Sequence, residues 1–67
     1  MDNAVRELRR EKNWTQEELA QKVLVSRQTI ISLEQGRYDP SIQLAFRLSR
    51  IFKKTIEEIF FYREEED

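Results

Sequence analysis

Apolar residues recur along the chain at intervals of three and four residues, which is the spacing of one face of a helix. We therefore expect an all-α fold, a compact five-helix bundle around a single small core. The inward-facing residues of the five predicted helices are, in chain order, Val5 and Leu8; Leu19, Ala20 and Val23; Ile30 and Leu33; Leu44, Leu48, Ile51 and Phe52; and Ile56, Ile59 and Phe60.

Polar residues ahead of the apolar stripes mark where the helices begin. Residues 15–18 and 55–58 each have a Thr followed three positions later by a Glu, which is the pattern of a capping box. Ser26 and Ser41 suit the N-caps of the third and fourth helices.

The helix ends are marked less sharply. We expect the first helix to run from about Asn3 to Lys12, with Asn13 as a left-handed residue that ends it. The third helix should run to Gln35 and stop at Gly36.

The second and third predicted helices are joined by Leu24 and Val25 alone. Such a short link cannot let the two helices lie antiparallel, so they must cross at a steep angle, which is the helix-turn-helix geometry. The segment that begins at Ser26 should then project outward.

The outward side of the third helix holds residues that suit base recognition. Arg and Gln side chains read guanine and adenine in the major groove, and Ile31 or the Thr29 methyl can contact a thymine methyl. The alternative is that Arg27, Gln28 and Ser32 are ordinary solvated residues, which composition alone favours.

Composition argues against catalysis and against a metal site. The chain has no Cys and no His, so the usual ligands of structural zinc and the commonest nucleophiles and bases are missing. We expect no enzyme activity, no cofactor and no metal, and no small-molecule pocket is evident.

The net charge of −1 conceals an uneven distribution. Residues 1–55 hold eleven Lys and Arg against seven Asp and Glu, whereas residues 56–67 hold one Arg against six acids. A basic body suits a polyanionic partner such as duplex DNA. We expect a DNA-binding domain over residues 1–62 and a solvated acidic tail over 63–67.

Nothing in the sequence predicts a membrane segment. The first residues contain no apolar run of the kind found in a signal peptide, and the longest apolar stretch is the four residues 59–62. The expected location is the cytoplasm.

From Leu8 to Phe60 the chain resembles the Cro and phage-repressor type of helix-turn-helix regulators, the XRE-like family, and in particular its small stand-alone members. Four motifs in fixed order carry the resemblance. They are Thr15-Gln16-Glu17-Glu18-Leu19-Ala20, Val25-Ser26-Arg27-Gln28-Thr29-Ile30, Leu33-Glu34-Gln35-Gly36-Arg37-Tyr38, and Pro40-Ser41 with Leu44-Ala45.

The resemblance implies roles at the matching positions. It implies a regulator of transcription, most often a repressor, that binds double-stranded DNA. The implied base-reading residues are Ser26, Arg27, Gln28 and Ser32, helped by Thr29; the implied phosphate-binding residues are Gln16, Arg37 and Tyr38; and Arg9 and Glu34 form an implied internal ion pair.

The chain departs from the family pattern at three positions. Leu24 stands where the turn between the helices usually has a Gly, so a left-handed backbone there would be strained. Ile31 stands where a small or polar residue is common, and Lys53 replaces a frequent Gly after the fourth helix.

A homodimer is expected because one recognition helix contacts too few base pairs for selectivity. Two copies would place their helices about 34 Å apart on a palindromic operator. Ile59, Phe61 and Tyr62 are the candidate dimer contacts, through a short extended segment paired across the two-fold axis. In the alternative, Phe61 and Tyr62 fold back onto the first helix.

A rival reading of the whole chain is an antitoxin-like module whose main task is to mask another protein. The apolar residues 60–62 and the acidic end favour it slightly.

Overall fold

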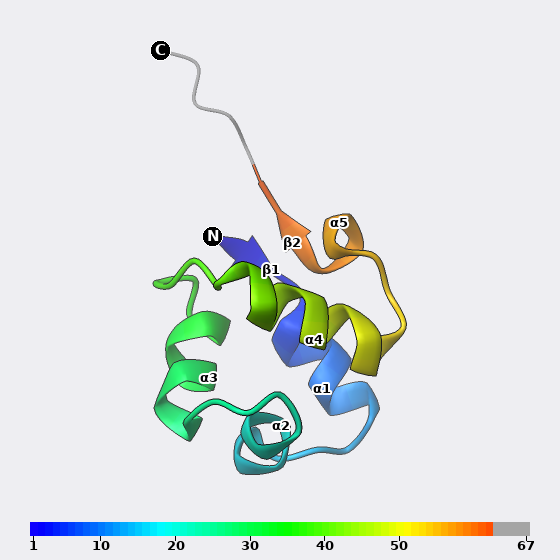
Figure 1. The fold of residues 1–67 in the computed structure, drawn as a ribbon. Coiled ribbons are helices and arrows are strands. Elements are labelled where there is room, and N and C mark those ends of the chain that lie inside the picture. The colour runs from blue at the N-terminus through cyan, green and yellow to red at the C-terminus, as the bar shows by residue number, and fades with distance from the viewer. Residues whose placement is uncertain (63–67) are drawn as a thin grey trace.

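The computed structural model describes residues 1–62, so the predicted acidic tail over 63–67 lies outside the described residues. The all-α five-helix prediction is confirmed, with a two-stranded sheet of two residues per strand added (Figure 1). The elements are β1 (Asp2–Asn3), α1 (Val5–Glu11), α2 (Gln16–Lys22), α3 (Arg27–Glu34), α4 (Ile42–Phe52), α5 (Ile56–Ile59) and β2 (Phe60–Phe61). Over residues 1–62, no helix has both the length and the apolar character needed to cross a bilayer.

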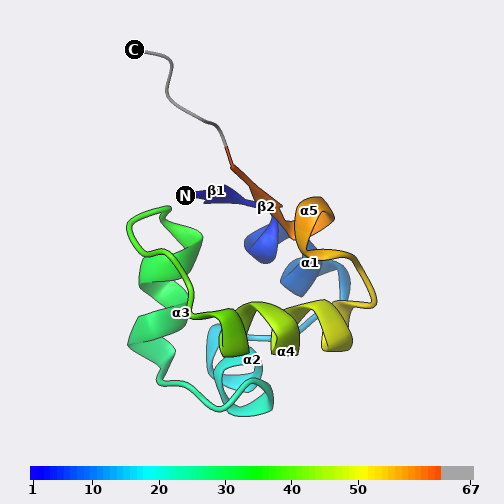
Figure 2. The same cartoon turned by 45° about the horizontal axis from the view of Figure 1, so that its top comes forward.

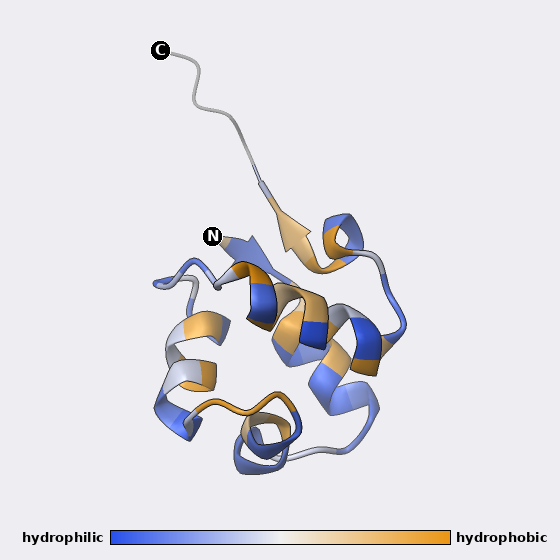
Figure 3. Ribbon diagram, viewed as in Figure 1, coloured by the Kyte–Doolittle hydropathy of each residue, from blue (hydrophilic) through white to orange (hydrophobic). Residues whose placement is uncertain are grey.

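One apolar core receives side chains from all five helices and from β2. Figure 3 shows hydrophobic and hydrophilic residues alternating around the helices, as amphipathic helices on a small core require. The residues predicted to face inward are buried, except that Leu8, Ile51 and Ile56 are half-buried against the core. The core residues are Val5, Leu19, Ala20, Val23, Ile30, Leu33, Leu44, Ala45, Leu48, Phe52, Ile59 and Phe60.

The four predicted N-caps are confirmed. The Thr15 hydroxyl accepts the Glu18 N–H at 3.0 Å, and the Glu18 carboxylate accepts the Thr15 N–H at 2.8 Å. Thr55 and Glu58 repeat this reciprocal capping box at the start of α5. Ser26 and Ser41 each accept an N–H of the first turn that follows. Local hydrogen bonding therefore sets where these four helices begin.

Within residues 1–62, three non-glycine residues have a left-handed backbone: Asn13 with φ of 59°, Leu24 with 63° and Lys53 with 56°. Leu24 and Lys53 are the two positions where the family that the sequence resembles usually has Gly, so the backbone keeps the conformation that Gly would favour. Leu24 and Val25 form the joint between α2 and α3, flanked by the C-cap Val23 and the N-cap Ser26.

The N-terminal residues correct the predicted start of the first helix. α1 begins at Val5, because Asn3 lies in β1 opposite Phe60 and its side-chain oxygen accepts the Val5 N–H at 3.1 Å. The same amide donates to the Leu33 carbonyl at 2.9 Å, which ties the chain start to the end of α3.

The C-terminal segment is extended, and it pairs within its own chain. Phe60 leaves the helix with φ of −115° and ψ of 133°, so it is buried from a strand rather than from the fifth helix. β2 runs antiparallel to β1, with Asp2 opposite Phe61. Figures 1 and 2 both show the two strands side by side near the C-terminal end of α3.

The left-handed Leu24 gives a first testable consequence. Its side chain is 72% exposed, so Leu24→Gly loses little burial while it removes strain of about 1–2 kcal/mol. The larger unfolded-state entropy of Gly offsets part of this gain, and we expect a net stabilisation of about 0.5 kcal/mol in urea unfolding.

Leu24→Ala is the matched control. Ala keeps the Cβ atom and therefore the strain, so it should not stabilise the fold. Equal effects of the two substitutions would show that strain at this position is not the cause.

Candidate nucleic-acid interface

α3 is anchored by one side and open on the other. Ile30 and Leu33 are its fully buried residues, and they pack in the core against the other helices. Figure 1 shows α3 at the edge of the molecule, with α2 crossing near the end where α3 begins. The opposite side of α3 is consequently available to a partner.

Arg27 and Gln28, in the first turn of α3, are the freest of the predicted base-reading residues. Both are exposed, and within residues 1–62 neither side chain makes a hydrogen bond or an ion pair. Ser32, one turn beyond Gln28, is half-buried. The helix fixes the backbone at these positions, while the hydrogen-bonding groups of the side chains have no partner within residues 1–62.

Ser26 and Thr29 are already engaged with one another. The Ser26 hydroxyl accepts the Thr29 N–H at 3.2 Å, and the two hydroxyls share a hydrogen bond at 3.0 Å. Capping is therefore a structural task of Ser26, and any base contact from either hydroxyl has to use its remaining hydrogen-bonding capacity.

The carboxylate of Glu34 joins three helices. It accepts the Arg9 Nε at 2.7 Å and the Arg9 Nη2 at 3.2 Å, while the Gln16 side-chain amide donates to it at 3.1 Å. Arg9 also donates from Nη1 to the Trp14 carbonyl at 2.8 Å. The Arg9 and Glu34 side chains are only 11% and 2% exposed, so this junction is a buried ion pair with satisfied geometry.

Gln16 donates a hydrogen bond to Glu34, and the sequence resemblance implies that it also binds a phosphate. Its amide braces the start of α2 against α3 through Glu34, and its side chain is half-buried. The implied contact with a phosphate stays a prediction.

The loop after α3 carries the other two predicted phosphate-binding residues. Gly36 turns the chain with φ of 76°, and the Arg37 N–H donates to the Ser32 carbonyl at 3.1 Å. The Arg37 side chain is exposed and Tyr38 is 36% exposed. The turn thus holds a cation and an aromatic hydroxyl at the surface next to the C-terminal end of α3.

The three candidate dimer residues lie in different environments. Ile59 has no exposed surface, because it packs in the core of its own chain, so it is unavailable to a partner. Phe61 is 46% exposed and Tyr62 is 72% exposed.

Two supporting residues were missed by the sequence analysis. Asn3 holds the chain start, and its position two residues before Val5 is a local signal for an Asx cap. Arg47 of α4 donates to the Val23 carbonyl at the end of α2, at 3.3 Å. No local pattern predicts the Arg47 contact, because its partner is 24 residues away.

Taken together, a short joint, a braced second helix and a third helix with free polar side chains define a helix-turn-helix DNA-binding domain. Among residues 1–62, no group of His, Cys, Asp and Glu is placed to hold a metal ion.

Comparison with known proteins identifies the family to which this domain is similar. The helix-turn-helix family profile matches residues 5–59. An uncharacterized HTH-type transcriptional regulator of Methanocaldococcus jannaschii is 50% identical over 66 residues, which are 98% of this chain and 100% of the relative. A similar regulator of Methanothermobacter thermautotrophicus is 52% identical, over 97% of this chain and 96% of the relative.

A solved structure agrees with this assignment. The clp gene regulator ClgR from Corynebacterium glutamicum superposes with a TM-score of 0.73 at 29% identity, covering 82% of this chain; the match spans 58% of the ClgR chain. The chain belongs to the XRE-type helix-turn-helix family of transcriptional regulators.

The Glu34 junction gives a second testable consequence. Glu34→Ala leaves the buried Arg9 guanidinium without its carboxylate, and we expect a loss of about 3 kcal/mol in urea unfolding. The double variant Arg9→Met with Glu34→Leu removes both charges and should recover most of that loss.

Glu11→Ala is the control for this measurement, because Glu11 is an exposed acid on α1. It should change the stability by less than about 0.5 kcal/mol. A Glu34→Ala protein as stable as the Glu11→Ala protein would contradict the bracing role.

Proposed function

We propose that this protein represses transcription by binding a palindromic operator as a homodimer, with the first turn of α3 in the major groove. The observation that carries the proposal is the exposed, unpartnered state of Arg27 and Gln28 within residues 1–62. Repression follows from occupancy, because a dimer on a promoter excludes the polymerase.

Base reading is assigned to the outward side of α3. The guanidinium of Arg27 can donate two hydrogen bonds to O6 and N7 of guanine, and the amide of Gln28 matches N6 and N7 of adenine. Ser32 is one turn further along and supplies a shorter polar contact. Ser26 and Thr29 assist from the cap, within the limits set by their mutual hydrogen bond.

Phosphate contacts are assigned to Gln16, Arg37 and Tyr38, which flank α3 on the preceding helix and the following loop. Such contacts fix the register of the protein on the duplex and carry no base information themselves. The bracing of Gln16 through Glu34 supports this role, since it limits the motion of the amide relative to the reading helix.

A dimer is proposed because a single module of this size buries less than roughly 1,000 Å² on DNA. The exposed Phe61 and Tyr62 support self-association near the C-terminal segment. Two copies related by a two-fold axis read inverted half-sites, so the operator is a palindrome.

Selection of bound duplexes from a random pool tests the proposal directly. We expect inverted half-sites whose centres are about 10–10.5 base pairs apart, or a multiple of that spacing. Enrichment of no common sequence would contradict specific binding, and enrichment of single half-sites would contradict the dimer.

Two substitutions separate base reading from phosphate binding. Arg27→Ala should weaken binding to the selected operator by about 1–3 kcal/mol and leave binding to random duplex nearly unchanged. Arg37→Ala should weaken both duplexes alike and reduce the slope of log affinity against log salt by about one.

Fluorescence anisotropy over a range of salt concentrations measures both effects. Arg50→Ala, an exposed Arg on α4 with no assigned DNA contact, is the charge-matched control and should change neither quantity. Equal losses on operator and random duplex for Arg27→Ala would contradict its base-reading role.

A further inference from the structure

Ile31 is an apolar residue of α3 to which the proposed function gives no role. It is half-buried, yet within residues 1–62 it is not among the residues that pack in or against the core. The partly buried apolar residues that do pack against that core are Met1, Leu8, Trp14, Val25, Ile51 and Ile56. Packing within residues 1–62 therefore does not explain an Ile at this position.

Helical geometry places Ile31 on the base-reading side of α3. Successive residues of an α-helix are turned by about 100°, so the buried Ile30 and Leu33 define the inward direction of this helix. With that turn, Ile31 lies about 50° from the opposite, outward direction and one turn beyond Arg27 and Gln28. An apolar side chain is thus held beside the polar side chains that are assigned to the bases.

Thr29, the other candidate for an apolar contact in the groove, lies closer to the inward direction. The same geometry turns it about 110° from the outward direction. Its hydroxyl shares a hydrogen bond with the Ser26 hydroxyl at 3.0 Å, and its N–H donates to the same oxygen at 3.2 Å. Thr29 therefore serves the cap of α3, and Ile31 is the better placed of the two.

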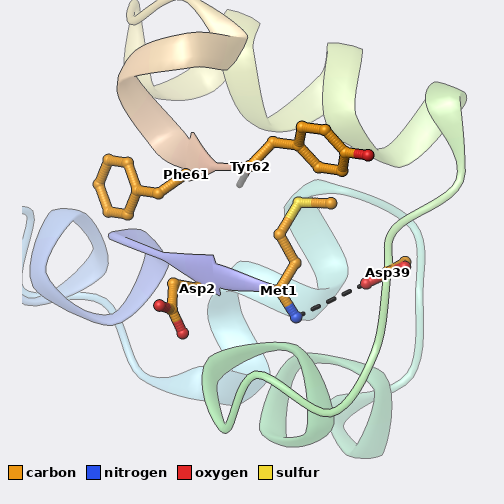
Figure 4. A pocket seen from close by; sticks show the side chains of 5 residues that line it. All are labelled: Met1, Asp2, Asp39, Phe61 and Tyr62. Carbon is orange, nitrogen blue, oxygen red and sulfur yellow. Dashed lines mark ion pairs between the residues drawn. The ribbon is translucent and has the colours of Figure 1, made fainter. Parts of the chain in front are cut away.

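Both ends of α3 are held, so its backbone is fixed where Ile31 is attached. Ser26 caps the start of the helix. At the other end, the Met1 ammonium donates to the Gly36 carbonyl at 2.9 Å and forms an ion pair with the Asp39 carboxylate at 3.6 Å (Figure 4). Ile31 lies near the middle of the helix, between these two contacts.

The apolar group that a base edge offers in the major groove is the C5-methyl group of thymine. The remaining recognition groups there are hydrogen-bond donors and acceptors. A branched aliphatic side chain gains free energy by burying the methyl group, whereas it loses free energy by covering a donor or acceptor whose bonds it cannot replace. An Ile on the reading side of α3 therefore favours a base pair that carries a C5-methyl group.

The rise of the helix limits which base pair this is. Ile31 lies about 4.5 Å beyond Gln28 and about 6 Å beyond Arg27 along the axis of α3. Successive base pairs are about 3.4 Å apart. Ile31 therefore reaches a base pair within two steps of the bases that Arg27 and Gln28 read.

We infer that Ile31 is a specificity-determining residue that reads the C5-methyl group of a thymine within two base pairs of the bases read by Arg27 and Gln28. The inference rests on the proposed function and deepens it, because it adds an apolar contact to the hydrogen bonds of α3. It also makes binding respond to DNA methylation, since 5-methylcytosine carries the same methyl group in the groove.

Replacing single thymines of the selected operator by deoxyuridine tests the inference with the unaltered protein. Uracil pairs with adenine as thymine does and lacks only the C5-methyl group. We expect one thymine in each half-site at which uracil lowers the affinity roughly fourfold in fluorescence anisotropy, which corresponds to about 0.8 kcal/mol for one buried methyl group. A half-site that contains no thymine, or in which no thymine responds, would overturn the inference.

Ile31→Ala assigns the methyl contact to its residue. Ala favours the helix and withdraws the larger side chain, so this variant should keep its helical circular dichroism and bind the thymine and uracil operators with nearly equal affinity. Leu24→Ala is the matched control, because it truncates an exposed apolar residue outside α3 and should keep the fourfold preference. A preference for thymine that persists in Ile31→Ala would overturn the inference.

Thr29→Ser tests the other apolar group near the start of α3. This substitution removes the Thr methyl group and keeps the hydroxyl that bonds to Ser26. The variant should retain the preference for thymine over uracil. Loss of that preference in Thr29→Ser but not in Ile31→Ala would assign the methyl contact to Thr29 and overturn the inference.

Methylated cytosine gives a second readout at the responsive position. Two operators with a C·G pair there, one with and one without the C5-methyl group, differ in that group alone. The wild-type protein should bind the methylated duplex roughly fourfold more tightly, and Ile31→Ala should bind both alike. Equal affinities of the wild-type protein for the two duplexes would overturn the inference.

The outcomes separate this inference from the proposed function. A uracil series without any response, together with an operator-specific loss in Arg27→Ala, overturns the methyl contact and leaves base reading by α3 standing. Failure to select any operator overturns both.

Discussion

The buried carboxylate of Glu34 is the constraint on which the rest of the structure depends. It belongs to α3, yet its partners are Arg9 of α1 and Gln16 of α2, and Arg9 also holds the Trp14 carbonyl between those two helices. A core this small supplies few apolar contacts to orient three short helices. A directional junction with almost no solvent access fixes their relative positions more sharply than apolar packing alone, which has no preferred direction.

That junction explains how one helix serves both the core and the surface. Ile30, Leu33 and Glu34 hold α3 in place from one side. The position of the helix therefore does not depend on Arg27 and Gln28, whose side chains have no partner within residues 1–62. Because the backbone that carries these two side chains is already fixed, binding through them costs conformational entropy only in the side chains themselves.

Much of the fold was predictable because its signals are local. The four N-caps depend on hydrogen bonds that span three residues, and the buried faces depend on helical spacing, so both can be read from short windows. The predictions that failed involve distant partners. Asn3 was placed in a helix but pairs with Phe60, and Ile59 was offered to a second copy but fills the core. Neither contact has a signature near the residue itself.

By itself, the sequence determined the helices, their faces and the outward position of Arg27 and Gln28, because capping and periodicity act within a few residues. Only the tertiary structure decided which apolar residues remained outside once the core was full. Ile59 and Tyr62 are three residues apart, yet one is fully buried and the other is 72% exposed. The space available in a core depends on every element that packs around it, so burial near a chain end is a property of the whole fold and not of the local sequence.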